Sequence, residues 1–537
     1  MKSYFKTSSL LAAWLILPLT SLHADDLKVA TIVGNHAVLQ RDTPVPVWGW
    51  ADAGTEVTVE FAGQKKTAKA GADGKWQVKL DKLTTSAEPR ELKVSAGGDK
   101  APVVLTDILV GEVWLGSGQS NMAMTVNRAD NYEQEQAAAN LPNVRMFVEK
   151  GASEPEALAD GKGEWRVTTP ETVGSFSAAL FFFGREIHRK LGVPVGLINS
   201  SVGGTPIEAW IDKDTQMAVP ELAAAAKAVP APAPVSAEVA MENYKKLLAR
   251  WEVLAQKAKE NNTEMPRKPR DPSVVSSRKN DVGGLFNGKI APLIPYAIRG
   301  ALWYQGEANS GPEKALLYGT QLSLLINDWR SRWGYEFPFA WAQLPNFGVV
   351  GRDWPTMREQ MLKTLAVPHT GMGINIDIGE EKNIHPKNKQ EVGRRLSLWA
   401  LGTVYDEKVE STSGPLPAGK EVGNGKVVVS FTHADKGLVA KDGELRGFVI
   451  AGEDQQWKPA QAKIEGDKVE VSSAEVAKPV AVRYAWENWP TCNLYNGAGL
   501  PATPFRTDSW SWKPPVPEVK SRLAPKPRAP AKPKADK

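Results

Sequence analysis

Ser120 stands in the stretch of this chain best suited to chemistry, the pentapeptide Gly118-Gln119-Ser120-Asn121-Met122. The apolar run before it, residues 108–115, is typical of a buried strand. In an open parallel sheet, ligands bind at the edge where the strands end. A tight, glycine-containing turn at that edge exposes a serine hydroxyl for attack on a carbonyl carbon. The alternative interpretation is an ordinary turn before a helix, because Ser and Asn are also common at helix N-caps.

A serine nucleophile needs a general base, and the chain has six histidines. His385 follows a predicted strand, residues 373–379, so we expect it at the same sheet edge as Ser120. His369 precedes that strand and belongs to the opposite edge. The remaining histidines lie elsewhere: His23 in a leader, His36 and His433 in β-rich flanking segments, and His188 in the middle of a helix. The sequence therefore predicts that His385 is the base, the alternative being a histidine of a surface loop.

Two further loops could hold the negatively charged oxygen that forms when a carbonyl is attacked. Gly203 and Gly204 follow a predicted strand, residues 195–199, and paired glycines let backbone N–H groups approach a ligand closely. Gln305 follows another predicted strand, residues 299–304, and offers a side-chain amide. Taken alone, each loop could also be an ordinary turn, in which glycine and polar residues are common. Because both follow strands of the same predicted sheet, we expect them to contain the oxyanion donors.

With these motifs the chain resembles the SGNH hydrolases, and within them the sialate O-acetylesterase group of carbohydrate esterases. The resemblance extends over most of residues 27–510. It rests on four stretches in the same order: Gly-Gln-Ser-Asn-Met from 118, Gly-Gly-Thr-Pro-Ile-Glu-Ala-Trp from 203, Trp-Tyr-Gln-Gly-Glu from 303 and Ile-His-Pro-Lys from 384.

The resemblance implies roles for the same residues. Ser120 is then the nucleophile and also a donor through its own N–H, and Gly203 or Gly204 is the second donor. His385 is the base, and Gln305 stands where many relatives carry Asn. We also expect the polar neighbours of these residues to bind substrate, namely Asn121, Glu307 and Asn309.

The implied function is an esterase that removes O-acetyl groups from acetylated carbohydrate through an acyl-enzyme, with sialate O-acetylesterase favoured. An esterase for acetylated xylan or another glycan is the alternative within this class. A non-catalytic glycan-binding protein is the alternative of another class, and the 19 tryptophans suit it, because aromatic rings stack on sugars. The intact set of reactive residues argues against that reading.

The residue that would orient the base departs from the family's pattern. Many SGNH enzymes carry Asp three residues before the histidine, but Lys382 occupies that position here and Asn383 follows it. The remaining acidic candidates are Asp377, Glu380 and Glu381. A backbone carbonyl that accepts the Nδ1–H of His385 would instead make a Ser–His dyad. We favour the carbonyl.

Other hydrolase classes fit the sequence less well. The nucleophile elbow of α/β-hydrolases is Gly-x-Ser-x-Gly, and Met122 stands where its last glycine would be. The histidines lack the spacing of zinc sites. No glycine-rich phosphate signature follows a strand. We therefore expect neither a metal nor a cofactor.

The beginning of the chain predicts export. Residues 1–24 combine two lysines, an apolar stretch and an alanine at a plausible cleavage point, which are the features of a signal peptide. No later segment approaches the ~20 consecutive apolar residues of a transmembrane helix. Cys492 is the single cysteine, so no intrachain disulfide can form. We expect a periplasmic or secreted protein.

The end of the chain carries its net charge. Residues 513–537 have eight Lys or Arg and two acidic residues, a net charge of +6 beside +5 for the whole chain. The body is therefore near neutral, and we expect no nucleic-acid partner. Because prolines interrupt the basic residues, the composition of this tail predicts an extended, disordered segment. It would be either a weak anchor to an anionic envelope surface or a solvated tail.

The patterning predicts an α/β fold with β domains on either side. Residues 25–105 alternate apolar and polar residues between turns, as in a small β-sandwich. Residues 106–410 alternate strands with amphipathic helices, which predicts an SGNH-like parallel sheet flanked by helices. Within them, residues 213–280 form a helical insertion, either a lid or cleft wall or a docked decoration. Residues 411–485 predict a second β domain, and residues 486–512 should return to the catalytic domain.

Overall fold

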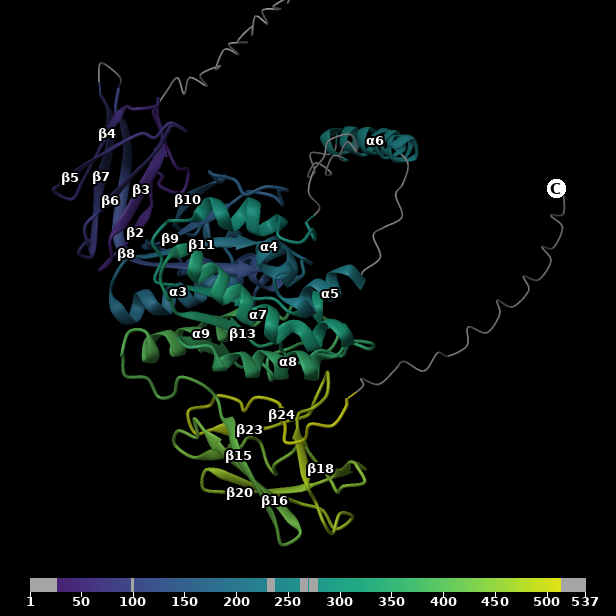
Figure 1. The fold of residues 1–537 in the computed structure, drawn as a ribbon. Helices are drawn as coiled ribbons and strands as arrows, with labels where there is room; N and C mark the ends of the chain where they lie inside the picture. The colour runs from purple at the N-terminus through teal and green to yellow at the C-terminus, as the bar shows by residue number, and fades with distance from the viewer. Residues whose placement is uncertain (1–26, 98–100, 229–236, 261–268, 270–278, 513–537) are drawn as a thin grey trace, which may run out of the picture.

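A computed structural model describes residues 27–97, 101–228, 237–260, 269 and 279–512. The predicted signal peptide, residues 1–24, and the predicted basic tail, residues 513–537, lie outside the described residues, as does part of the insertion at 213–280. Figure 1 shows β strands at each end of the molecule and a mixed α/β region between them.

The middle region is built on a largely parallel sheet with the strand order β10-β9-β11-β8-β12-β13-β14. Its strands are β10 (Gly163–Thr168), β9 (Leu141–Glu149), β11 (Val195–Ser201), β8 (Val103–Gly118), β12 (Gly300–Tyr304), β13 (Phe339–Ala342) and β14 (Thr370–Gly373). All neighbours from β9 to β14 are parallel, and β10 is antiparallel to β9 at the edge. The carboxyl ends of the parallel strands therefore meet at one edge of the sheet, as the alternation of strands and helices predicts.

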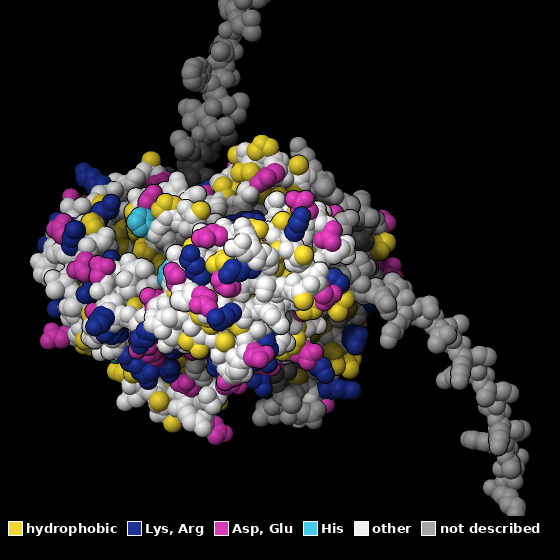
Figure 2. All heavy atoms as spheres, turned by 90° about the horizontal axis from the view of Figure 1, so that it is seen from below, with side chains coloured by type: hydrophobic (Ala, Val, Ile, Leu, Met, Phe, Trp, Pro, Cys, Tyr) yellow, Lys and Arg dark blue, Asp and Glu magenta, His cyan; other side chains and the backbone are white. Residues whose placement is uncertain are grey.

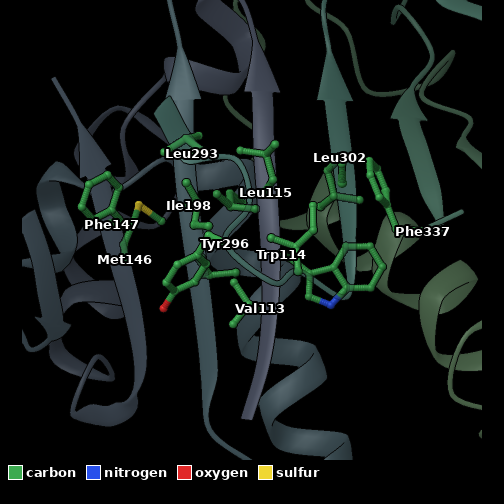
Figure 3. Packing of buried hydrophobic residues seen from close by; sticks show 14 of the residues in the cluster. Val113, Trp114, Leu115, Met146, Phe147, Ile198, Leu293, Tyr296, Leu302 and Phe337 are labelled. Atoms are coloured by element: carbon green, nitrogen blue, oxygen red, sulfur yellow. The ribbon is translucent and has the colours of Figure 1, made fainter. Parts of the chain in front are cut away.

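Helices cover both faces of this sheet, so its strands β12 and β13 are apolar and buried at every position. The longer helices are α3 (Ala178–Leu191), α7 (Pro312–Trp333), α8 (Trp354–Lys363) and α9 (Lys389–Thr403). Trp114 of β8 packs edge-on against Phe183 of α3, with 4.9 Å between ring centroids. Trp329 of α7 packs in the same way against Trp303 of β12, at 6.1 Å. Figure 3 shows Trp114 among the buried side chains of the sheet.

The N-terminal β region is joined to the middle region by a shared strand. One sheet contains β1 (Lys28–Val29), β3 (Val45–Trp50) and β6 (Lys75–Leu80). The other strands attach to β8, directly or through a neighbour: β2 (Val38–Gln40), β4 (Glu56–Phe61), β5 (Gln64–Lys69) and β7 (Ser86–Ala96). One hydrophobic core runs through both regions. The predicted boundary between residues 105 and 106 thus falls inside the continuous strand β8.

The C-terminal β region has a core of its own. Its strands are β15 (Leu416–Gly423), β16 (Lys426–Thr432), β17 (Leu438–Ala440), β18 (Phe448–Ala451), β19 (Lys458–Pro459), β20 (Gln461–Glu465), β21 (Lys468–Ser472), β22 (Ala481–Tyr484), β23 (Leu494–Asn496) and β24 (Phe505–Arg506). Residues 486–512 contribute β23 and β24 to this region. They also contact the middle region, where Trp512 Nε1 donates to Asp353 Oδ1 at 3.0 Å. The predicted return to the catalytic region is therefore combined with strand pairing in the C-terminal region.

The described part of the insertion is helical. It contains α4 (Lys213–Met217), α5 (Pro220–Ala228) and α6 (Ala237–Glu260), and α6 stands apart from the body in Figure 1. Leu247 and Leu254 of α6 have relative exposures of 55% and 45%. None of the described helices is long and apolar enough to cross a membrane.

The described surface mixes charges of both signs. Figure 2 shows lysines and arginines interspersed with aspartates and glutamates over one face. This pattern agrees with a body whose net charge is near zero.

Candidate active site

Ser120 is held at the sheet edge, partly buried, by a turn that requires glycine. It begins α1 (Ser120–Ala123), two residues after β8 ends at Gly118. Gly118 has a φ of +132°, and a Cβ there would lie 2.2 Å from the carbonyl oxygen of Tyr304. The Gln119 N–H donates to the same carbonyl at 3.0 Å. Backbone N–H groups in the first turn of a helix have no partner within the helix, so that of Ser120 can serve a ligand.

His385 lies beside Ser120, although the strand before it is placed differently from the prediction. β14 covers Thr370–Gly373, whereas the sequence predicts a strand at 373–379. After Gly373 the chain bonds to the segment beyond β13 instead of extending the sheet: the Gly379 N–H donates to Asn346 Oδ1 at 2.8 Å. The following loop places His385 Nε2 at 2.8 Å from Ser120 Oγ. The structure thus brings the predicted nucleophile and base within hydrogen-bonding distance.

The loop that carries His385 is shaped by its own polar side chains. Asn383 Oδ1 accepts the His385 N–H at 3.0 Å, and Asn383 Nδ2 donates to Glu380 Oε2 at 3.0 Å. Glu380 Oε1 also accepts the backbone N–H of Lys387 at 2.8 Å. Glu380 and Asn383 therefore support the backbone around the histidine.

None of the three acidic candidates forms a hydrogen bond with the His385 ring. Asp377 makes two bonds with the Arg395 guanidinium, of 2.6 and 2.9 Å, and accepts from the Tyr495 hydroxyl at 3.0 Å. Glu380 serves the loop, and Glu381 is exposed. The expected backbone carbonyl is not found either, because Nδ1 of His385 forms no hydrogen bond with the described part of the chain.

Positive charge and burial favour the neutral form of the base. The pKa of His385 is lowered below 6.5, first by burial and then by the positive charges of Lys389 and Arg128. A neutral imidazole can accept the serine proton.

The paired glycines face the nucleophile. A Cβ at Gly203 would lie 3.5 Å from Ser120 Cβ, so this loop packs against the serine. Gly204 has a φ of +70°, a conformation that favours glycine. Lys279 Nζ donates to the Gly203 carbonyl at 2.8 Å. Because C=O and N–H point in opposite directions across a trans peptide, this bond turns the Gly204 N–H away from Lys279.

The side-chain amide of Gln305, the predicted oxyanion donor, is fully occupied within the protein. Its Nε2 donates to Thr205 O at 3.1 Å and to Asn309 Oδ1 at 2.8 Å, and its Oε1 accepts from Tyr318 at 2.8 Å. An amide has two N–H donors, so none is left for an oxyanion. The geometry favours a scaffolding role that joins two loops of the sheet edge.

The predicted substrate-binding residues are also buried. Asn121, Glu307 and Asn309 have relative exposures of 0%, 5% and 0%. Asn121 Nδ2 donates to Glu307 Oε1 at 2.5 Å and to the Ile384 carbonyl at 3.0 Å. Asn309 Nδ2 donates to Glu208 Oε2 at 2.8 Å. These contacts favour a positioning role over contact with substrate.

Two cationic residues near the pair escaped the sequence analysis. Lys389 Nζ donates to Asn121 Oδ1 and to the Pro386 carbonyl, each at 2.7 Å. A signal for Lys389 was present: Asn388 caps α9, so the lysine stands in the first turn, where the helix dipole disfavours a cation. Arg128 ends η1 (Val126–Arg128) and is exposed, and no motif marks it.

An open cavity lies beside His385. Its volume is about 440 Å³, and it is lined by Met124, Asn127, Arg128, Ala129, Asp130, Asn131, Asn383, His385 and Lys387. Among the described residues, no group of three or more His, Cys, Asp or Glu is arranged to hold a metal ion.

Comparison with known proteins identifies the family. A model of the family "Carbohydrate esterase, sialic acid-specific acetylesterase" matches residues 110–255 and 288–399. The chain is 30% identical to sialate O-acetylesterase of Rattus norvegicus, over 89% of this chain and 94% of the relative. It is also 30% identical to that of Homo sapiens, over 91% and 95%.

A solved structure agrees with these relatives. The crystal structure of XAC1771, a novel carbohydrate acetylesterase from Xanthomonas citri, is 35% identical and superposes with a TM-score of 0.75. The match covers 90% of this chain and all of that one. The chain therefore belongs to the sialic acid-specific acetylesterase family of carbohydrate esterases.

Proposed function

We propose that this chain is a serine esterase that removes O-acetyl groups from acetylated sialic acid. Its family makes it a carbohydrate O-acetylesterase, and hence a carboxylic ester hydrolase. The observation that carries the serine mechanism is the 2.8 Å contact between Ser120 Oγ and His385 Nε2 at the edge of the sheet.

The reaction proceeds in two steps on this pair. Ser120 Oγ attacks the acetyl carbonyl carbon while its proton passes to His385 Nε2. The Ser120 N–H and that of Gly203 or Gly204 hold the oxyanion. When the tetrahedral intermediate collapses, the ester C–O bond breaks and the sugar oxygen takes the proton from His385. A water then attacks the acetyl-serine with His385 as base, and acetate leaves.

The charge of the cavity supports sialic acid as the substrate. Sialic acids carry a carboxylate, whereas acetylated xylan is a neutral chain. Arg128 and Lys387 line the cavity beside His385, together with a single acid, Asp130. A guanidinium recognises a carboxylate through charge-assisted hydrogen bonds. Acetylated xylan or another neutral glycan is the second candidate, and it would make no use of these cations.

Acetate release separates the two substrates. The panel consists of 9-O-acetyl sialic acid and acetylated xylo-oligosaccharides, with Arg128→Gln as the variant and Asn127→Ala as a control from the same cavity. Loss of a charged hydrogen bond should raise KM for the sialate about tenfold in Arg128→Gln. At a pH where His385 is neutral, the same variant should leave xylo-oligosaccharide hydrolysis unchanged. Faster hydrolysis of the xylo-oligosaccharides by the wild type would contradict the sialate assignment.

A second test addresses the non-catalytic alternative. The purified protein should release acetate from 4-nitrophenyl acetate, and Ser120→Ala should not. Binding of acetylated glycans without any such release would instead make the chain a glycan-binding protein.

We extend the proposal to the fold and location. The parallel sheet, with Ser120 after β8 and His385 beyond β14, supports an SGNH-hydrolase fold with β domains at 25–105 and 411–485. The sequence features of residues 1–24 support export to the periplasm or medium, and the basic tail could then contact an anionic envelope. Fractionation of cells that express the full chain tests this location.

A further inference from the structure

Lys389 is a buried cation in an unfavourable place. It is fully buried and stands in the first turn of α9. Burial of a charge is costly unless hydrogen bonds compensate, and the N-terminal end of a helix repels a cation. A residue so placed needs specific partners.

The partners of Lys389 directly follow the nucleophile and the base in the chain. Its Nζ donates to Asn121 Oδ1 and to the Pro386 carbonyl, each at 2.7 Å, and lies 5.3 Å from the centre of the Tyr304 ring. Asn121 in turn donates to Glu307 Oε1 at 2.5 Å. The side chain of Asn121 therefore bridges a buried cation and a buried carboxylate.

This bridge holds the backbone on both sides of His385. Asn121 directly follows Ser120 in the chain. Its Nδ2 donates to the Ile384 carbonyl at 3.0 Å, and Lys389 holds the Pro386 carbonyl. The residues before and after the base are thus bound to side chains that are anchored next to the nucleophile.

We propose that Lys389, Asn121 and Glu307 form a positioning network that sets His385 against Ser120, a task that an acidic residue performs in a Ser-His-Asp triad. The inference rests on the proposed esterase function. In the described part of the chain no carboxylate reaches the His385 ring, so the backbone contacts of this network fix the position of the base.

The charge of the network also acts on the base. Burial lowers the pKa of Lys389 to about 7, while Glu307, Glu380 and Asp130 oppose the shift and Arg128 adds to it. Lys389 is therefore protonated in the acidic range where His385 titrates. Its charge, with that of Arg128, helps to lower the pKa of His385. Removal of Lys389 should raise the pKa of His385.

Lys389→Met tests the network, with Lys289→Met as the matched control. Lys289 is also buried, with a pKa lowered to about 7, but it pairs with Glu149. Misplaced reacting groups cost about 100-fold, so we expect that loss in kcat for Lys389→Met with little change in KM. The acid limb of its pH profile, where kcat/KM rises as His385 loses its proton, should move to higher pH. Lys289→Met should leave the limb in place. An unchanged kcat or an unmoved limb in Lys389→Met would overturn the proposal.

A second variant covers the case in which Lys389→Met fails to fold. Asn121→Ala keeps both buried charges and removes the bridge, and it should lower kcat by about the same factor. Where Lys389→Met does fold, the double variant should be little worse than either single variant, because groups that act as one unit are not additive. Multiplied losses would show that the residues act separately and would contradict the network.

An NMR titration of His385 tests the network independently of whether the protein is an esterase. With 13C-labelled histidine and His385→Gln for assignment, the pKa of His385 should be higher in Lys389→Met than in the wild type and unchanged in Lys289→Met. If the wild type releases no acetate but the pKa of His385 rises, the esterase proposal fails and the electrostatic link stands. If the pKa of His385 is the same in all three proteins, the network is wrong whatever the activity.

Discussion

Two buried lysines of this molecule look alike by burial and differ in what they bind. The pKa of Lys289 and that of Lys389 are each lowered to about 7 by burial. Lys289 forms an ion pair with Glu149 and donates to the Gly151 carbonyl at 3.2 Å. Lys389 reaches Glu307 only through Asn121, and its other bond ends on the backbone beside His385. A buried charge and a shifted pKa thus do not mark a functional residue by themselves; the groups at the end of its hydrogen bonds do.

The largest effects should come from the pair that Lys389 supports. Ser120→Ala and His385→Ala should each lower kcat by roughly 10⁴-fold or more, because each removes a group that forms or breaks bonds. The double variant should be little worse than either. Acetate release measures all three. If the two single losses multiplied in the double variant, the residues would not act as a dyad.

Lys289 should affect stability and leave turnover unchanged, the opposite of Lys389. Lys289→Met leaves the Glu149 carboxylate buried without its partner, so the free energy of unfolding should fall by about 3–5 kcal/mol. Denaturant titration measures this loss, and Lys289→Met combined with Glu149→Gln should recover part of it. The kcat of the folded protein should stay near that of the wild type. A kcat loss equal to that of Lys389→Met would erase the distinction between the two lysines.

Gln305 should behave as a scaffold. Its replacement should lower kcat less than Ser120→Ala or His385→Ala and should lower stability less than Lys289→Met. Gln305→Ala leaves the buried groups that it satisfies without partners, which costs roughly 1–3 kcal/mol of unfolding free energy. Because both of its N–H groups are already donated, kcat should fall by less than the ~10²-fold typical of a lost oxyanion donor. A loss of 10²-fold or more with unchanged stability would restore the donor role.

The smallest effects are expected from the three acids near His385. Asp377→Asn, Glu380→Gln and Glu381→Gln should each lower kcat less than tenfold, far below the ~10⁴-fold lost when a triad aspartate becomes an amide. Asp377 is held by Arg395, and Glu380 serves the loop backbone. Steady-state kinetics on variants that keep their circular dichroism decides the matter. A loss of about a thousandfold in any one of them would identify a triad acid.

The sequence led to Ser120 and His385 because both follow strands, and the edge of a parallel sheet brings such positions together. The strand before His385 was misplaced because alternation of apolar and polar residues describes Ile374 to Ile378 as well as a true strand. In the structure, side chains such as Asn375 and Asp377 bond to neighbouring segments there.

Buried polar residues were harder to assign from sequence. Four polar residues follow β8 or β12 by a few positions, where polar residues usually face solvent or ligand: Asn121, Gln305, Glu307 and Asn309. Whether they are buried depends on how loops from distant parts of the chain pack, which no local pattern records. Lys389 left a local trace, a cation in the first turn of a capped helix, and that trace could have been used.

Ser120 should become acetylated during the reaction. The most direct test is to mix the enzyme with acetylated substrate, quench in acid during turnover, and analyse the peptides by mass spectrometry. We expect the mass of one acetyl group on the peptide that contains Ser120, more of it in Lys389→Met if water attack is slowed more than acylation, and none in Ser120→Ala. Turnover with no acetyl group on Ser120, or an acetyl group that persists on another residue when Ser120 is replaced, would show that Ser120 is not the nucleophile.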